Sequence, residues 1–123
     1  MTYDELRRYR RANTGPGHTV QFKARNRFFM GLSVVSMGAG GCSVKISITL
    51  AASLKPDDPL TKLFLLHPDL PQVPLEGRVS WIRGRQPGLE ENALLMGIEF
   101  LSLEEGYAKL LDDYVVQLLK EGH

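Results

Sequence analysis

The chain of 123 residues has little of several things that would point to particular classes of protein. Cys42 is its single cysteine, so no disulfide can form within the chain and a reducing compartment is expected. The formal net charge is only +1, which argues against a strong overall attraction to nucleic acid or to a membrane surface. No apolar run approaches the ~20 residues that span a bilayer, and the N-terminus has no apolar signal segment. We therefore expect a cytoplasmic protein with no membrane partner.

Signals of catalysis and of metal binding are equally scarce. The three histidines, His18, His67 and His123, are scattered along the sequence with no cysteine or carboxylate at the spacing of metal ligands. Neither a nucleophile elbow nor a phosphate-binding loop of the Gly-x-x-x-x-Gly-Lys type is present. Asp57-Asp58 fits a turn and Asp112-Asp113 a helix surface better than an acid–base pair. We expect no metal, no cofactor and no enzymatic activity.

What the chain does have is an uneven distribution of charge. Residues 1–27 carry seven basic residues against two acidic ones, a net +5, whereas residues 101–123 carry two basic against five acidic, a net −3. Four of the basic residues form one cluster: Arg7, Arg8, Arg10 and Arg11. A guanidinium group grips phosphate with two parallel hydrogen bonds and stacks on purine rings. We therefore interpret residues 1–18, which include the helix-breaking sequence Gly15-Pro16-Gly17, as a basic arm. Any anion-binding site is expected on this arm.

The next part of the chain reads as short strands. Period-two alternation is clearest over residues 42–50, and strands are also predicted over 19–26, 28–36, 61–66, 73–83 and 93–100. A glycine-rich turn is expected over residues 37–41. Trp81 follows the apolar Val79 at a spacing of two and is expected in the core. Six short strands with tight turns predict a mainly β fold, a small six-stranded antiparallel barrel over residues 19–100.

A helix is predicted over residues 101–123. Ser102 and Glu105 have the spacing of a capping box, and apolar side chains then recur at helical spacing until near Gly122. Cys42 is expected to be an inert buried thiol, and Tyr107 and Tyr114 belong to the apolar stripe of the helix. This stripe fits either the flank of the barrel or the interface of a homodimer, and the sequence leaves both open.

Four segments together resemble the PilZ domain family. They are the pair Arg7-x-x-x-Arg11, the serine- and glycine-rich residues 34–41, the stretch 77–81 (Gly-Arg-Val-Ser-Trp) and the stretch 96–100 (Met-Gly-Ile-Glu-Phe), followed by the helix. The resemblance implies a six-stranded β-barrel with a C-terminal α-helix that binds the bacterial second messenger cyclic di-GMP. It also implies that the domain signals to an unidentified protein partner, in motility or another surface behaviour. The ligand-binding residues it implies are Arg7, Arg8, Arg11, Ser36, Gly38, Gly40 and Gly41.

The second family motif, Asp or Asn-x-Ser-x-x-Gly, fits residues 34–41 in two ways. If Ser36 is the motif serine, Val34 takes the acidic position and Ala39 the closing glycine. If Gly40-Gly41 is the anchor, Ser36 takes the acidic position and Gly38 the serine position. Either alignment lacks one group that reads guanine, and a lost hydrogen bond costs about 1–3 kcal/mol.

Two other functions therefore stay open. The first is a PilZ-like adaptor that has lost the ligand and acts by protein–protein contacts alone. The second is a small-barrel nucleic-acid binder, a function that the basic arm supports. The near-neutral net charge and the lack of a clear outward row of aromatic side chains make nucleic acid the less favoured partner.

Overall fold

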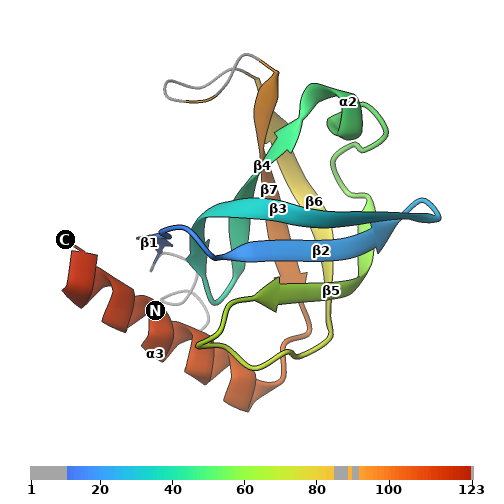
Figure 1. Ribbon diagram of the computed structural model, residues 1–123. Helices are drawn as coiled ribbons and strands as arrows, with labels where there is room; N and C mark the ends of the chain where they lie inside the picture. The colour runs from blue at the N-terminus through green and yellow to red at the C-terminus, as the bar shows by residue number, and fades with distance from the viewer. Residues whose placement is uncertain (1–10, 85–88, 90–91, 123) are drawn as a thin grey trace.

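The structure is a computed structural model that describes residues 11–84, 89 and 92–122 (Figure 1). The described residues form seven strands and two helices. The strands are β1 (Ala12–Asn13), β2 (Thr19–Ala24), β3 (Arg27–Gly38), β4 (Gly41–Ser47), β5 (Pro59–Leu66), β6 (Leu75–Arg83) and β7 (Ala93–Leu101). The helices are α2 (Ile48–Ala51) and α3 (Glu105–Gly122).

Strands β2 to β7 close into a six-stranded antiparallel barrel, which confirms the predicted fold. Neighbours follow the order β3-β2-β5-β6-β7-β4, and pairing of β3 with β4 joins the two ends. β3 can pair with both β2 and β4 because it is 12 residues long. Its first half pairs with β2, from Arg27 to Ser33, and its second half pairs with β4, from Val34 to Gly38. The short β1 is an additional strand beside the end of β3.

The barrel interior is filled by alternate side chains of every strand. Phe22 and Phe29 stack at its centre with ring centroids 5.0 Å apart. The period-two pattern that predicts strands over 19–26 and 42–50 is the alternation between this core and the outer face. Other fully buried side chains of the interior are Val20, Val44, Ile46, Leu60, Leu63, Leu65, Val79 and Met96.

The turn predicted over residues 37–41 is shorter in the structure. Met37 still pairs with Cys42 and Gly38 with Gly41, so the β3–β4 ladder continues to the end of the hairpin. Only Ala39 and Gly40 remain for the turn. Two-residue connections are the commonest hairpin turns, and a ladder of this length leaves room for nothing longer.

The strand predicted over residues 42–50 ends at Ser47, because this serine starts a helix instead. Its hydroxyl accepts a hydrogen bond from the backbone N–H of Leu50 at 3.1 Å, and the four residues of α2 follow. Serine is a favoured N-cap, and this local bond outweighs the alternation. Ile48, which fits the strand pattern, is 49% exposed on the short helix.

The long helix α3 is confirmed, but its predicted cap is wrong. Ser102 has a positive φ of 52° and lies before the helix. Glu104 caps it instead, because its carboxylate accepts hydrogen bonds from the backbone N–H groups of Gly106 at 2.8 Å and Tyr107 at 3.1 Å. A carboxylate at this end also complements the helix dipole.

The apolar face of α3 packs on β1 and β3 at one end of the barrel (Figure 1). Tyr107, Leu111 and Val115 are buried there, so this part of the stripe belongs to the core. Leu110 and Leu119 face outward and are exposed. None of the helices among the described residues combines the length and hydrophobicity that a membrane span requires.

Leu111→Ala should destabilise the protein by about 2–5 kcal/mol, because Leu111 is fully buried between α3 and the barrel. The neighbouring Leu110→Ala is a matched control, since Leu110 is 39% exposed and should change the free energy of unfolding by less than about 0.5 kcal/mol. Urea unfolding followed by circular dichroism measures both. Equal, small effects would mean that α3 does not pack on the barrel in solution.

Candidate ligand-binding site

One stretch of the outer barrel face carries several glycines and serines aligned across strands. Side chains alternate between the two faces of a strand, and Val79, Ile98 and Cys42 between these residues are buried, so the aligned residues face outward. The first row, in cross-strand register, is Trp81, Gly97, Ser43, Ser36 and Asn13. The second row is Arg78, Glu99, Gly41 and Gly38.

Two glycines of this face cannot carry a side chain. A Cβ atom at Gly41 would clash with the backbone oxygen of Ile98, and one at Gly97 would clash with the indole of Trp81. Gly41 is therefore needed for the close approach of β4 to β7, and Gly97 for the position of the tryptophan. The result is a floor made largely of backbone, to which a flat group can come close.

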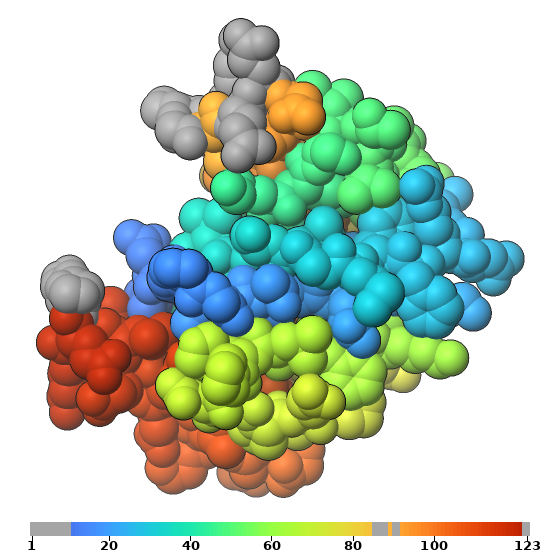
Figure 2. Space-filling model, viewed as in Figure 1, coloured from blue at the N-terminus to red at the C-terminus, as the bar shows by residue number. Residues whose placement is uncertain are grey.

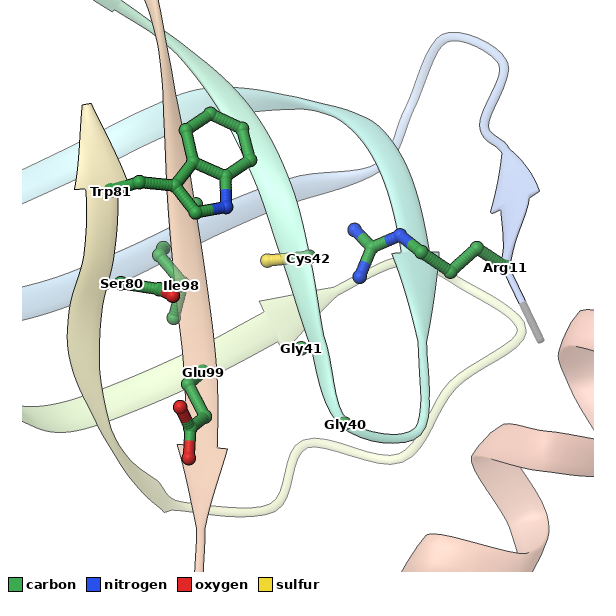
Figure 3. Close-up of a pocket in the computed structure, with 9 residues that line it drawn as sticks. Arg11, Gly40, Gly41, Cys42, Ser80, Trp81, Ile98 and Glu99 are labelled. Atoms are coloured by element: carbon green, nitrogen blue, oxygen red, sulfur yellow. The ribbon is translucent and has the colours of Figure 1, made fainter. Parts of the chain in front are cut away.

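Trp81 forms one wall above this floor, and its predicted place in the core is wrong. The register of β6 against β7 shifts between Val79 and Trp81, which marks a β-bulge. The extra residue leaves Val79 in the core and turns Trp81 to the outer face, where it is half-buried over Gly97. Arg83 stacks on the indole, with the guanidinium carbon 4.3 Å from the ring centroid. In Figure 3 the indole nitrogen points toward the side from which Arg11 reaches in.

Arg11 forms the opposite wall. It stands immediately before β1, and the pairing of Asn13 with Ser36 brings it beside β3. Its Nη2 donates to the hydroxyl of Ser36 at 3.1 Å, and that hydroxyl shares a 2.7 Å hydrogen bond with the hydroxyl of Ser43. This contact uses a single N–H of a guanidinium that carries several, so the group can also hold an anion. Figure 3 shows its side chain directed over the β3–β4 hairpin.

A carboxylate stands at the end of the floor beside Gly41. Oε2 of Glu99 accepts from both Nη2 and Nε of Arg78, at 2.9 and 3.3 Å. Nη1 of Arg78 also binds Oδ1 of Asp57 at 3.1 Å. The ion pair fixes the orientation of the Glu99 side chain and offsets its negative charge.

Between these walls lies an open hollow of about 180 Å³. Its lining comprises Arg11, Gly40, Gly41, Cys42, Ser80, Trp81, Gly97, Ile98 and Glu99. Pockets that enclose a drug-sized ligand measure roughly 300–1,000 Å³. This hollow can therefore hold one flat ring but does not enclose a larger ligand.

The structure brings several of the expected site residues together. Arg11, Gly40 and Gly41 line the hollow and Ser36 binds Arg11, while Gly38 pairs with Gly41 one step along the hairpin. Arg7 and Arg8 lie outside the described residues.

Sequence reasoning missed three groups at this site: Ser43, Glu99 and the wall formed by Trp81. A signal for Ser43 existed, because it lies two residues after Gly41 and so shares its outward face. Glu99 could have been found in the same way, from its opposition to Gly41 across a predicted strand pair.

Cys42 is buried beneath the hairpin, and burial raises the pKa of its thiol to about 12, with the charge of Arg11 acting in the opposite direction. No group of three or more His, Cys, Asp or Glu side chains arranged to hold a metal ion occurs among the described residues. The site therefore offers an arginine, hydroxyls, a carboxylate and an aromatic face, which suit an anionic ligand with a planar ring.

Comparison with known proteins gives a consistent result. The model of the PilZ domain family matches residues 5–117. The fold is similar to that of the K. pneumonia MrkH–c-di-GMP complex, with a TM-score of 0.76 and 12% identity over 90% of this chain and 51% of that one. It is similar to the PilZ domain with c-di-GMP of YcgR from Escherichia coli, with a TM-score of 0.75 and 16% identity over 94% and 92% of the two chains.

A third similar structure is the Bacillus subtilis inhibitor of motility MotI/DgrA, with a TM-score of 0.74 and 18% identity over 92% of this chain and 52% of that one. The chain thus spans about half the length of MrkH and of MotI. A search of curated protein sequences gives no significant match.

Cys42 should react slowly with a thiol reagent such as DTNB at pH 8. A rise in pKa from 9.0 to about 12 lowers the thiolate population about a thousandfold, and the strands above it block access. We expect labelling of the folded protein to be at least a hundredfold slower than labelling in urea, where the same thiol is exposed. Because the chain has one cysteine, the signal has one source. Rapid labelling of the folded protein would mean that the β3–β4 hairpin opens readily.

Proposed function

The chain belongs to the PilZ domain family, and from this we propose that it is a receptor domain for cyclic di-GMP that signals to a partner protein. The observation that carries the proposal is the hollow between Arg11 and Trp81, with its floor at Gly41 and Gly97. Cyclic di-GMP combines two phosphates with two guanines, so it needs a cation and a flat aromatic surface close together. Structures of MrkH and of the YcgR PilZ domain, which share this fold, were solved with c-di-GMP.

Arg11 is the proposed phosphate ligand among the described residues. Its guanidinium is already oriented by the bond to Ser36, so less conformational freedom is lost when a phosphate binds. A charge-assisted bond to phosphate is about twice as strong as a neutral hydrogen bond. Arg7 and Arg8 would supply the further contacts, because a hollow of about 180 Å³ cannot enclose the whole ligand. The arm would then close over the bound ligand.

The strand register favours one of the two alignments of the serine–glycine motif. Val34 is buried and pairs with the buried Val44, so it faces the core and not the hollow. Ser36 and Gly41 face outward, which supports the alignment with Ser36 in the acidic position and Gly41 as the closing glycine. The hydroxyl missing at Gly38 has a substitute nearby, because Ser43 presents its hydroxyl to Ser36.

Glu99 is the proposed reader of guanine. The N1–H and N2–H groups of guanine donate hydrogen bonds, and a carboxylate is an acceptor for both. Glu99 adjoins Gly41 in the strand register and lines the hollow. It would thereby restore the acidic group that the serine–glycine motif lacks.

The proposed receptor acts without catalysis, through the surface that the arm changes when it closes. The competing function is that of an adaptor that no longer binds the ligand. It stays open because Gly38, at the serine position of the motif, has no side chain to hydrogen-bond the ligand. A nucleic-acid binder is less favoured: of the phenylalanines on the first two barrel strands, Phe22 and Phe29 are buried and Phe28 alone is exposed.

Arg11→Ala should weaken the binding of cyclic di-GMP roughly tenfold to a hundredfold in isothermal titration calorimetry. The reason is the loss of a charged hydrogen bond worth about 1.5–3 kcal/mol. Arg27→Ala is the matched control, because Arg27 is an exposed arginine on the first half of β3, away from the hollow, and its loss should leave the affinity within about twofold. If folded wild-type protein gives no heat at high ligand concentration, the proposed receptor function is wrong and the adaptor function is favoured. Salt-sensitive retention of single-stranded nucleic acid would favour the nucleic-acid-binding function.

Glu99→Gln should weaken the binding of cyclic di-GMP about tenfold and leave the affinity for cyclic di-AMP unchanged, because adenine has no N1–H donor for a carboxylate. Trp81, the single tryptophan of the chain, reports binding through its emission. Asp57→Asn is the control, since it removes the other acidic partner of Arg78 and leaves the hollow intact. Equal losses for both dinucleotides would contradict the role of Glu99 in reading guanine.

A further inference from the structure

Two histidines that are far apart in the sequence stack face to face at the end of the barrel that α3 covers. His18 lies on the connection from β1 to β2, and His67 follows the last residue of β5. Their ring centroids are 3.9 Å apart and the rings are inclined by only 13°. His18 is 5% exposed, so the contact is shielded from water.

The hydrogen bonds of the two rings define their protonation. Nδ1 of His18 lies 3.2 Å from the carbonyl oxygen of Gly15, which can only accept, so Nδ1 carries the hydrogen. Nε2 of the neutral ring then accepts from the hydroxyl of Tyr114 at 2.8 Å. Nδ1 of His67 accepts from the backbone N–H of Asp69 at 3.0 Å and so carries no hydrogen. Every one of these bonds is satisfied when both rings are neutral.

This cluster joins three separate parts of the fold. His18 belongs to the segment that leads from the N-terminal arm into the barrel, His67 to the end of β5, and Tyr114 to the middle of α3. Figure 2 shows α3 lying against the segment that follows β5. Because the hydroxyl of Tyr114 also lies 3.5 Å from Nδ1 of His67, a single helix side chain meets both rings.

We propose that His18, His67 and Tyr114 form an acid-sensitive latch, which holds α3 on the barrel while both imidazoles are neutral and loosens α3 when His18 takes up a proton. The proposal does not depend on the binding of cyclic di-GMP. According to this proposal, the packing of α3 on the end of the barrel depends on pH.

Protonation breaks the arrangement at two points. A proton on Nε2 of His18 turns an acceptor into a donor, so the Tyr114 hydroxyl must reverse. The acceptor that remains near its own hydrogen is Nδ1 of His67, which is 3.5 Å away and already accepts from the backbone N–H of Asp69. The resulting positive ring also faces the second imidazole, which is itself a base, at stacking distance. A second proton, on His67, would put two like charges in contact.

The charged and titratable groups around His18 come from two elements. The segment after β5 contributes His67 and Asp69, and α3 contributes Tyr114, which in turn feels Asp69 and Glu121. Burial lowers the pKa of His18; the Gly15 carbonyl and the charge of Asp69 raise it, and His67 lowers it further. The carboxylate of Asp69 is 71% exposed, so water and salt screen its effect.

The sign of the pH dependence follows from this lowered pKa. The unfolded chain takes up the proton at the ordinary pKa of 6.5, whereas the folded protein takes it up only at lower pH. The contribution of His18 to stability is therefore complete above pH 6.5 and is lost as the pH falls from there through the folded pKa. Uptake of one proton limits the loss to about tenfold in the folding equilibrium per pH unit.

Hydrogen exchange of the backbone amides, corrected for the intrinsic effect of pH, tests the latch directly. Between pH 7.5 and 5.5 we expect the amides of α3 to lose protection several-fold while those of β4 and β7 keep theirs. NMR titration of the histidine rings should show His18 titrating below its ordinary value. Loss of protection in the barrel equal to that in α3 would mean that acid unfolds the whole domain, and a His18 that titrates at or above 6.5 would equally overturn the latch.

Two variants separate the latch from a general effect of acid. In His18→Gln the amide can still bond to Tyr114 but cannot titrate, so the pH dependence of α3 protection should vanish. His123→Gln, which removes the histidine nearest the C-terminus, is the matched control and should keep the wild-type dependence. Tyr114→Phe keeps the ring and should lower α3 protection roughly three- to tenfold at pH 7.5. If His18→Gln fails to fold, Tyr114→Phe decides alone: unchanged α3 protection would refute the latch.

Discussion

The pairing of β3 with β4 is the contact on which the rest of this molecule depends. It joins the two ends of the sheet, and without it β3 and β4 would both be open edges. The same pairing sets Ser36 against Ser43 and Gly38 against Gly41, so barrel closure and the floor of the hollow are one structure. Gly41 carries both roles, since β4 can approach β7 only where no side chain intervenes.

Arg11 connects this floor to the N-terminal arm. Its bond to Ser36 is a direct contact between the described part of the arm and the site, and β1, which begins at the next residue, fixes its position. The same stretch of chain continues through Gly15 to His18, which contacts α3 through Tyr114. A few residues thus link the hollow, the arm and the helix. Movement of the arm on ligand binding and release of the helix by acid would both act on this short segment.

The period-two pattern of the strands was sufficient to predict the barrel, although register shifts interrupt the alternation at several strand pairs. The period-two pattern alone predicted the strands at residues 19–26 and 93–100, and the helical spacing of apolar residues alone predicted α3. Two errors came where one local bond outweighed the pattern, and the error at Trp81 came from the bulge in β6. Ser47 ended a strand by capping α2, and Glu104 displaced Ser102 as the cap of α3. Periodicity carries no information about such bonds.

The site was harder to predict than the fold, because its geometry depends on long-range pairing. The cluster of arginines and the serine- and glycine-rich hairpin identified the region, yet Glu99 and Ser43 became part of it only through cross-strand register. His18 and His67 looked scattered because nothing in a linear sequence reveals that two rings stack. Arg7 and Arg8 remain predictions, since they lie outside the described residues.

The bulge in β6 makes the aromatic wall depend on strand register as well as on residue type. With regular pairing of the same residues, Trp81 would follow Val79 into the barrel interior and the hollow would lose one side. Deleting the one extra residue, in contrast, would leave the tryptophan opposite Gly97 and the wall in place. Two chains of this family with the same tryptophan at the same spacing can thus differ in whether it meets a ligand, because only the chain with the bulge turns the ring outward.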